Sequence, residues 1–309
     1  MDEDFSINID VVECIDKRNL VARISRQVQW IESIDDRHQA SLKALEEKLA
    51  EFYSTNPDYY SQIDFTANNW IDKDEIAYSQ IVRTAKDSRF ICEVGCGGAN
   101  ILKYYSELAS LYSGCDFSNK LINENKKLYP EARFLRIDQP NKLPYQDSIF
   151  DFVFSVFVLE HSTNPALLLD ECTRILKPSG KLIILCPDFL GRRRMTSQRA
   201  GWSAGTSRQK LRRGKLLDSV LTLFDNRIRI PFYCKKFLKK ASLKPAFFVN
   251  TAPIVFEDPF SPDVDAVYVA YKLEIENYLS NRFAKIDSGD EMIRYERSKG
   301  LIYLSFIRR

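Results

Sequence analysis

The chain has 309 residues, of which 45% are hydrophobic and 28% are charged. This balance is typical of a folded globular protein, and it excludes disordered, collagen-like and disulfide-scaffold classes. The acidic start, Met1 to Asp4, predicts no signal peptide, and the longest apolar stretch, Phe150 to Leu159, is too short to span a bilayer. Seven scattered cysteines fit a reducing compartment, so we expect a cytoplasmic protein without a transmembrane segment.

Charge is distributed unevenly along the chain, although the formal net charge is only +3. Between Phe189 and Lys244 there are sixteen Lys or Arg residues and two acids, Asp218 and Asp225. This segment therefore carries a formal charge of +14, and the remainder of the chain carries −11. The excess favours an anionic partner, although a solvated basic loop has the same composition.

The first part of the chain contains a heptad pattern of apolar residues, which predicts a long helix. Its seam consists of Val21, Ile24, Val28, Ile31, Leu42, Leu45, Leu49 and Phe52. The helix could pair with a second chain to form a homodimer, or it could turn back at residues 34–38 as an antiparallel helix pair. A helix that only packs on the neighbouring domain gives the same pattern. Residues 53–73 are rich in Tyr, Asn, Asp and Ser and predict a loop.

Beyond residue 72, short apolar runs alternate with helical patterns, which is typical of a parallel sheet with crossover helices. We expect helices over Asp72–Lys86 and over Val264–Leu279. A further helix follows the first strand, with Ile101, Leu102, Tyr105 and Leu108 on one face, and another precedes the fifth strand and ends at Lys177. The predicted strands are Phe90–Val94, Tyr112–Asp116, Arg133–Ile137, Phe150–Phe157, Lys181–Cys186, Arg282–Ile286 and Leu301–Ile307.

A glycine-rich loop, residues 95–99, directly follows the first strand. Glycines allow positive φ angles and close approach of a ligand, and the next helix offers free N–H groups. The dinucleotide-binding fingerprint requires Gly where this chain has Asn100. Glu93, just before the loop, would repel a pyrophosphate but suits a ligand that carries an ammonium group and no phosphate.

Four motifs in this order resemble the class I S-adenosylmethionine-dependent methyltransferases over roughly residues 88–188. The family's acid and glycine loop match Glu93, Gly95 and Gly97, with Ala99 in place of the last Gly. Its ribose-binding acid matches Asp116 at the end of the second strand. The third motif matches Asp138, Leu143-Pro144-Tyr145 and Phe150-Asp151, and the fourth matches Leu159-Glu160-His161 and residues 174–180, with Ser179 where Gly is usual.

The resemblance implies a doubly wound α/β fold, with a mostly parallel seven-stranded sheet whose last strand is antiparallel, preceded by an N-terminal helical segment. It divides the chain into a helical region (1–72) and a methyltransferase domain (73–309) with a basic lid insertion at about 189–263. It also implies S-adenosylmethionine as cofactor, with Asp116 on the ribose and Asp138 on the adenine amino group. The full set of expected cofactor contacts is Glu93, Gly95, Cys96, Gly97, Asp116, Phe117, Asp138, Gln139 and Val156.

Methyl transfer is an in-line displacement at a sulfonium carbon, so the protein mainly has to align the acceptor with the methyl group. A hydroxyl acceptor also needs a base, for which we consider His161 the candidate and Glu160 a weaker one. A packing or capping role is the alternative for His161. Cys92 and Cys96 lack further ligands at zinc-site spacing, so we expect no metal.

The basic segment bears on the methyl acceptor, because in this fold the corresponding segment often covers the acceptor. An anionic small molecule or glycan, an RNA, or an anionic membrane surface fits its charge. We rank RNA lower, since no RNA-binding module accompanies the patch. The expected function is methylation of a small-molecule, glycan or phosphorylated acceptor. The alternatives are an RNA methyltransferase and a non-catalytic subunit that only binds S-adenosylmethionine.

Overall fold

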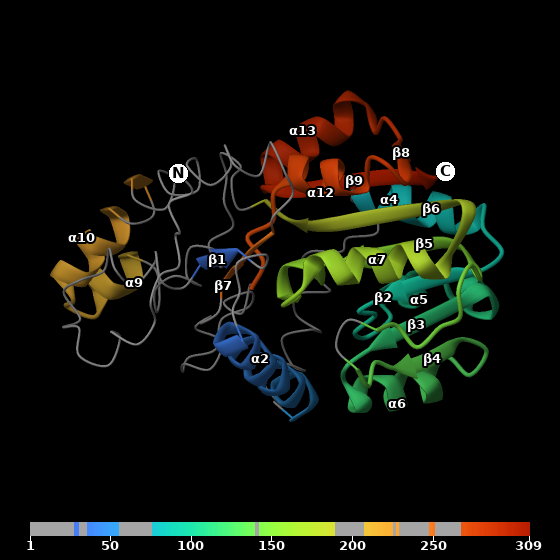
Figure 1. The fold of residues 1–309 in the computed structure, drawn as a ribbon, viewed down its shortest axis with the longest axis horizontal. Coiled ribbons are helices and arrows are strands. Elements are labelled where there is room, and N and C mark those ends of the chain that lie inside the picture. The colour runs from blue at the N-terminus through green and yellow to red at the C-terminus, as the bar shows by residue number, and fades with distance from the viewer. Residues whose placement is uncertain are drawn as a thin grey trace.

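The computed structural model describes residues 28–30, 36–55, 76–139, 142–188, 207–224, 227–228, 247–250 and 267–309 (Figure 1). Its main sheet has seven strands in the order β4-β3-β2-β5-β6-β9-β8. The strands are β2 (Ile91–Val94), β3 (Tyr112–Asp116), β4 (Arg133–Arg136), β5 (Phe150–Val156), β6 (Leu176–Pro187), β8 (Phe283–Lys285) and β9 (Leu301–Arg308).

Strands β2 to β6 are parallel to one another, whereas β9 is antiparallel to both β6 and β8. The prediction of a mostly parallel seven-stranded sheet with an antiparallel last strand is confirmed. The order reverses beside β2, because the chain first builds outward to β4 and then returns to place β5 on the other side. In open α/β sheets, ligands bind at such a switch point, beside the carboxyl ends of the strands.

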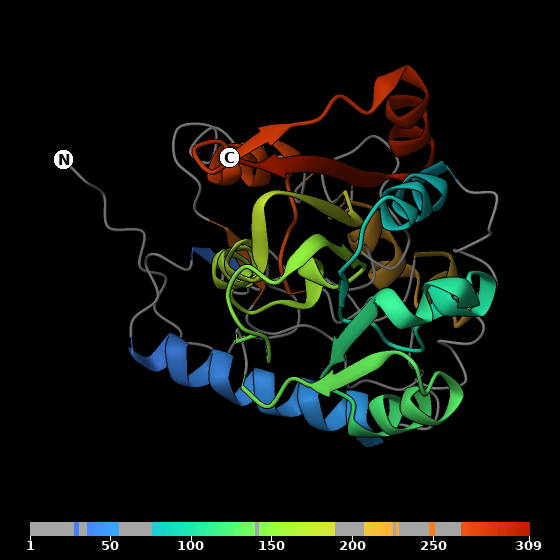
Figure 2. The ribbon, with the colours of Figure 1, turned by 90° about the vertical axis from the view of Figure 1, so that its right-hand side faces the viewer.

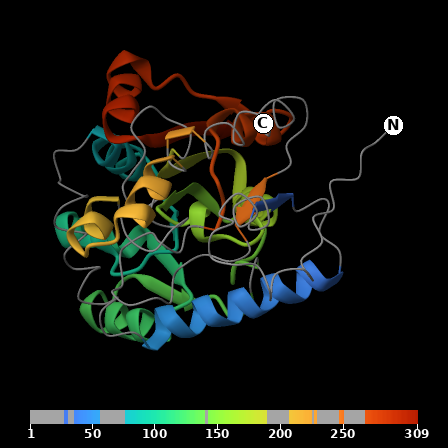
Figure 3. The same cartoon turned by 90° about the vertical axis from the view of Figure 1, so that its left-hand side faces the viewer.

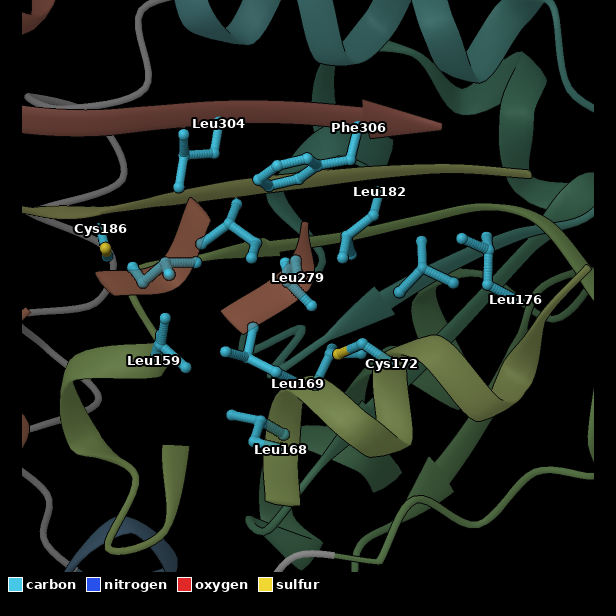
Figure 4. Close-up of a cluster of buried hydrophobic side chains, with 14 of the residues drawn as sticks. Leu159, Leu168, Leu169, Cys172, Leu176, Leu182, Cys186, Leu279, Leu304 and Phe306 are labelled. Carbon is cyan, nitrogen blue, oxygen red and sulfur yellow. The ribbon is translucent and has the colours of Figure 1, made fainter. Parts of the chain in front are cut away.

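Helices cover both faces of the sheet, as Figure 2 shows with α13 and α4 on the opposite side from α7. One apolar core lies under α7 (Pro165–Ile175) and α12 (Lys272–Leu279). Figure 4 shows this core, where Leu169 and Cys172 lie on the side of α7 that faces Leu279 of α12 and Leu182 of β6. The second core lies under α4 (Ile76–Lys86), α5 (Asn100–Tyr104) and α13 (Gly289–Lys299). The strands alternate between the two cores, since Cys92 packs in the first core and Ile91 in the second.

Two predicted helix boundaries are wrong around the sheet. The helix after β2 ends at Tyr104 and continues as a 3-10 helix, η3 (Ser106–Leu111), because Tyr105 leaves the helical region with φ −137°. The helix before β6 ends at Ile175, two residues earlier than predicted. Leu176 instead pairs with Phe150 of β5, so pairing in the sheet prevails over helical continuation there.

The helix predicted over Val264–Leu279 begins only at Lys272, and residues 264–266 lie outside the described part of the chain. Val267 to Ala270 are not helical and are buried, and Tyr268 forms an isolated bridge with Val249 in β7 (Phe248–Asn250). Apolar residues buried on all sides mimic a helical stripe in the sequence. Helix α13 was not predicted, because its sequence is mainly charged and only Met292 and Tyr295 of its apolar residues are buried.

The prediction of a helix from the N-terminal heptad pattern is wrong over residues 28–30. These residues form β1 (Val28–Trp30), which pairs antiparallel with β7. A helix, α2 (Asp36–Thr55), follows and runs along the lower edge of the molecule in Figures 2 and 3. Its seam residues Leu45 and Leu49 pack on Val249 and Val267 of the same chain. This is the arrangement in which the helix packs on the neighbouring domain. A homodimer through this helix stays a prediction.

Most of the basic segment lies outside the described residues, including Arg192–Arg194 and Lys235–Lys240. Apart from residues 227–228, its described part is a helical hairpin, α9 (Ser207–Arg212) and α10 (Leu216–Phe224), which stands apart from the sheet in Figure 1. In the part of the chain that the structure describes, no helix is long and apolar enough to cross a membrane.

Candidate methyl-donor site at the carboxyl edge of the sheet

The glycine loop between β2 and α5 adopts a backbone that few residues tolerate. Gly95, Gly97 and Ala99 have φ angles of +70°, +47° and +51°. A Cβ atom at position 95 would lie 2.2 Å from a side-chain carbon of Val158, so a side chain there is excluded by space as well as by φ. Ala99 occupies a left-handed conformation, which accounts physically for the Gly that the resembling family has at this position.

Asp116, at the end of β3, ties this loop to the neighbouring strand. The N–H of Gly97 donates to Oδ2 of Asp116 over 2.9 Å, and the N–H of Ser118 donates to Oδ1 over 2.8 Å. The N–H of Phe117 also contributes a backbone hydrogen bond to this carboxylate. A carboxylate has about four lone-pair sites, so Asp116 keeps acceptor capacity beyond these bonds. Burial raises the pKa of Asp116, and hydrogen bonds from backbone amides oppose that rise.

Further hydrogen bonds fix the loop from both sides. The carbonyl oxygen of Cys115 accepts from the N–H groups of Gly95 and Cys96 over 2.8 and 3.0 Å. The side-chain amide of Asn125, in α6 (Asn119–Leu128), donates to the carbonyl oxygen of Gly97 over 2.7 Å. Because these partners come from β3 and α6, the loop is held in place by its neighbours without a ligand.

Glu93 is buried at the end of β2, where it accepts a hydrogen bond from the hydroxyl of Tyr112. Burial raises its pKa from 4.5 to about 8, the Tyr112 hydrogen bond opposes the rise, and the charge of Asp116 adds to it. In the free protein near neutral pH, the carboxyl group is therefore mainly protonated. A positively charged group brought next to it would favour its ionised form.

The structure brings most of the predicted cofactor contacts together at neighbouring strand ends. Cys96 is buried, whereas Phe117 and Val156 are half-buried and pack at the margins of the two cores. Asp138 and Gln139 follow β4, where the N–H of Ile137 donates to the carbonyl oxygen of Asp116 over 2.9 Å. Both side chains are exposed, and Asp138 forms an ion pair with Arg136 over 3.5 Å.

His161 lies in a 3-10 helix, η4 (Leu159–His161), just after β5. Its Nε2 is 3.8 Å from Oε1 of Glu160, a fully buried carboxylate. Its Nδ1 is 3.4 Å from the hydroxyl of Tyr53 in α2, and the two rings meet edge to face with centroids 6.0 Å apart. The imidazole thus lies between a carboxylate of its own segment and a phenol from the N-terminal helix.

A second contact joins the same two segments, because the hydroxyl of Thr163 donates to the carboxylate of Glu46 in α2. The carbonyl oxygen of Glu160 accepts from the N–H groups of Val267 and Tyr268 over 2.7 and 2.8 Å. Sequence reasoning missed Tyr53 and Glu46, since residue 53 was expected in a loop and no local motif marks either position. The only available signal was the heptad pattern, which continues to the neighbouring Phe52.

The cysteines near the loop are free and buried, and burial raises the pKa of Cys92, Cys96 and Cys172. Such thiols behave as small apolar side chains rather than as nucleophiles. Within the described ranges, no group of three or more His, Cys, Asp or Glu side chains is arranged to hold a metal ion.

Comparison with known proteins agrees with this geometry. Residues 92–184 match the family model described as a methyltransferase domain. A probable S-adenosylmethionine-dependent methyltransferase of Mycolicibacterium smegmatis is 26% identical over 121 residues, which cover 39% of this chain and 46% of that protein. A ubiquinone biosynthesis O-methyltransferase of Coxiella burnetii is 26% identical over 141 residues, 44% of this chain and 59% of its own length.

Among solved structures, an S-adenosylmethionine-dependent methyltransferase from Aquifex aeolicus is 14% identical, with a TM-score of 0.44 over 83% of this chain and all of that chain. The chain spans about half the length of the two curated relatives named above. The resemblance to the methyltransferases that the motifs indicate is confirmed over residues 92–184, which match a methyltransferase domain.

Proposed function

We propose that this chain binds S-adenosylmethionine at the carboxyl edge of its sheet and transfers the methyl group to a hydroxyl of a small-molecule acceptor. The observation that carries the proposal is Asp116, whose carboxylate holds the glycine loop and keeps acceptor capacity at the carboxyl edge of the sheet. A carboxylate with remaining lone pairs suits the hydroxyls of a ribose. The match of residues 92–184 to a methyltransferase domain supports the same reading.

The residues at this edge fit the proposed cofactor. The loop presents backbone without side chains at Gly95 and Gly97, so a ligand can approach it closely. Glu93 ionises most easily beside a cation, so it suits an ammonium group better than a pyrophosphate. When bound, S-adenosylmethionine supplies a methyl group that is activated by the positive charge on sulfur. We assign Phe117, Asp138, Gln139 and Val156 to the adenosine end, as the motif order implies.

We assign the role of general base to His161. The Glu160 carboxylate near Nε2 favours the tautomer that carries its proton there, which leaves Nδ1 as the basic nitrogen. The hydroxyl of Tyr53 contacts that nitrogen and can hold the imidazole ring in its orientation. Tyr53 acts through His161 and is therefore a positioning residue in this scheme.

The acceptor class rests on charge and on the relatives. The basic segment supports an acceptor with an anionic group, such as a phosphorylated small molecule or glycan. The ubiquinone biosynthesis O-methyltransferases of Coxiella burnetii and Maricaulis maris support a small molecule over RNA. We place the reaction in the cytoplasm, because the described cysteines are free and buried, as a reducing compartment favours.

Asp116→Asn tests donor binding. The amide offers one acceptor oxygen in place of two and brings a donor toward Gly97 or Ser118, so we expect affinity for S-adenosylhomocysteine to fall by about tenfold or more. Isothermal titration calorimetry measures this, with NAD as a competing ligand. Asp87→Asn, an exposed acid beyond α4, is the matched control and should bind as the parent chain does. Equal affinity of Asp116→Asn and the parent, or heat with NAD alone, contradicts the proposal.

His161→Gln tests the chemistry. Incubation with isotope-labelled donor and fractionated cell extract identifies the acceptor, and we then expect transfer to fall about 100-fold while donor affinity stays unchanged. Tyr53→Phe should shift the pH profile of transfer and lower its rate less. If His161→Gln transfers the methyl group as fast as the parent chain, His161 is not the general base and has a packing role. Donor binding without transfer to any fraction favours the non-catalytic subunit.

A further inference from the structure

Helix α10 is amphipathic, but its polar side chains are the buried ones and its large apolar side chains are exposed to solvent. Ser219 and Thr222 are buried, whereas the large apolar side chains are exposed. The exposed large apolar residues of the hairpin are Leu211, Leu216, Leu217, Val220, Leu223 and Phe224, and Ile228 further along the chain is exposed as well. A contiguous apolar surface of this kind marks an interaction site, because a free globular chain rarely leaves one in water.

Polar contacts hold the hairpin in this orientation. The hydroxyl of Ser219 donates to the carbonyl oxygen of Ser207 over 2.7 Å, and Nζ of Lys210 donates to the hydroxyl of Thr222 over 2.9 Å. Gly214, with φ +72°, makes the turn between the two helices. In the described part of the chain, α9 and α10 make their main contacts with each other rather than with the sheet. The apolar face therefore owes its exposure to a defined structure.

Exposed cations lie next to this apolar face in the sequence, in α9 and in the turn. They are Arg208, Arg212, Arg213 and Lys215, and Asp218 is the single acid of residues 207–224. The wider segment from Phe189 to Lys244 carries +14, so the charge of the hairpin belongs to a much larger excess. Apolar side chains flanked by Lys and Arg are the pattern of a helix that lies in a membrane interface, with its cations at the level of anionic headgroups.

We propose that α10 inserts its apolar face into the surface of an anionic lipid bilayer, with the cations of α9 and the turn on the headgroups. The exposed side chains are aliphatic apart from Phe224, which suits acyl chains and gives little for nucleic-acid bases to stack on. A second copy of the chain would bring one basic surface against another. Charge complementarity therefore favours the lipid surface over both.

The hairpin lies on the side of the molecule to which the carboxyl ends of the parallel strands point. In Figure 1, β6 runs toward α9 and α10, and in Figure 3 the hairpin faces the viewer in front of the sheet. A bilayer on this hairpin consequently lies on the same side as the proposed methyl-donor site. This placement concerns the function proposed above, but the docking itself does not depend on it.

Vesicle co-sedimentation of the full chain tests the proposal without any methyl donor or acceptor. We expect binding to vesicles of an equimolar mixture of phosphatidylcholine and phosphatidylglycerol, and at least tenfold weaker binding to phosphatidylcholine alone. Leu217→Glu combined with Val220→Glu should lower binding to the mixed vesicles at least tenfold. These side chains are 68% and 54% exposed, so their replacement leaves the fold intact, as circular dichroism can verify.

Leu128→Glu is the matched control, because Leu128 is 67% exposed at the end of α6 and outside the hairpin, and it should bind as the parent chain does. In Leu217→Trp, the added fluorescence should shift to shorter wavelength with mixed vesicles. Equal binding of the double variant and the parent, or equal binding to both kinds of vesicle, overturns the proposal. A parent chain that is dimeric where the double variant is monomeric assigns the face to a second copy and also overturns it.

Discussion

At the residue scale, Gly95 is the position of the proposed donor site that tolerates substitution least. Replacing it with Ala forces a left-handed φ of +70° on a residue with a side chain and drives that side chain into Val158. We expect Gly95→Ala to lower the free energy of unfolding by about 2–5 kcal/mol, the sum of backbone strain and overpacking. Urea unfolding followed by circular dichroism measures the change.

Gly289→Ala separates the two contributions to that loss. Gly289 has φ +78°, but nothing lies within 4 Å of a Cβ built there, so only the conformational cost of about 1–2 kcal/mol applies. Adding Val158→Ala to Gly95→Ala should recover part of the steric loss and none of the conformational one. If Gly95→Ala and Gly289→Ala lowered the free energy of unfolding equally, the contact with Val158 would not contribute to the loss of stability.

Glu93 should make the stability of the protein depend on pH. Its pKa is about 8 in the folded chain and 4.5 when the carboxyl group is fully exposed to water, as it is after unfolding. Between these pH values the folded state therefore keeps a proton that the unfolded state has lost. The stability contributed by this group is complete below pH 4.5 and falls as pH rises toward 8. We expect the free energy of unfolding to fall by about 3–5 kcal/mol across that window, measured by urea unfolding at several pH values.

Glu93→Gln should remove this part of the pH dependence, since the amide has the same shape and still accepts a hydrogen bond from Tyr112. The exposed Glu131→Gln is the control and should follow the parent curve. If the free energy of unfolding of Glu93→Gln and of the parent changes equally between pH 5 and 8, Glu93 is ionised in the folded chain. Neighbouring groups then stabilise its charge enough to offset the effect of burial.

The individual site residues differ in how well the sequence predicts them. Asp116 and the glycine loop lie at the ends of adjacent strands, and strand ends can be recognised from short apolar runs. Tyr53 contacts His161 across 108 positions of the chain, and a contact of that range depends on how α2 packs on the domain. No spacing or local motif encodes it, so only the structure reveals it.

At the element scale, α2 carries the residue that meets His161, and its own attachment is modest. Leu45 and Leu49 bury against Val249 and Val267. We expect Leu49→Ala to weaken this docking by about 2–4 kcal/mol, so that the amides of α2 exchange with solvent faster while the sheet keeps its protection. Hydrogen–deuterium exchange read by mass spectrometry resolves the two regions.

Lys43→Ala changes an exposed residue of the same helix and serves as the control. A loss of protection in both α2 and the sheet would mean that the helix and the sheet unfold as one unit. Unchanged exchange in Leu49→Ala would mean that other contacts hold α2.

The sequence predicts the existence of most elements but misplaces several of their ends. Strand β3 begins at Tyr112 and ends at Asp116, as predicted. The ends of α7 and α5 are decided by pairing of Leu176 in the sheet and by the conformation of Tyr105, which are tertiary effects. Strand β1 shares an apolar spacing with the heptad, and only its partner β7 makes it a strand.

At the scale of the whole molecule, the alternation of strands and helices predicted the parallel sheet, and the resemblance of the motifs to a known family implied its antiparallel last strand. The order of motifs predicts the donor site at the switch point beside β2. The outward apolar face of α10 could not be predicted in this way. The pattern of apolar and polar residues shows that α10 has two different faces, but it does not show which of them is buried. In the structure, the buried face is the polar one, with Ser219 and Thr222.

The position of β9 has a consequence for how the protein is made. This strand lies between β6 and β8, yet both of its neighbours precede it in the chain. During translation β6 emerges with an unpaired edge, and β8 emerges with no neighbour at all, until residues 301–308 leave the ribosome. The nascent chain therefore passes through a stage in which an open sheet edge is available to chaperones and to other nascent chains.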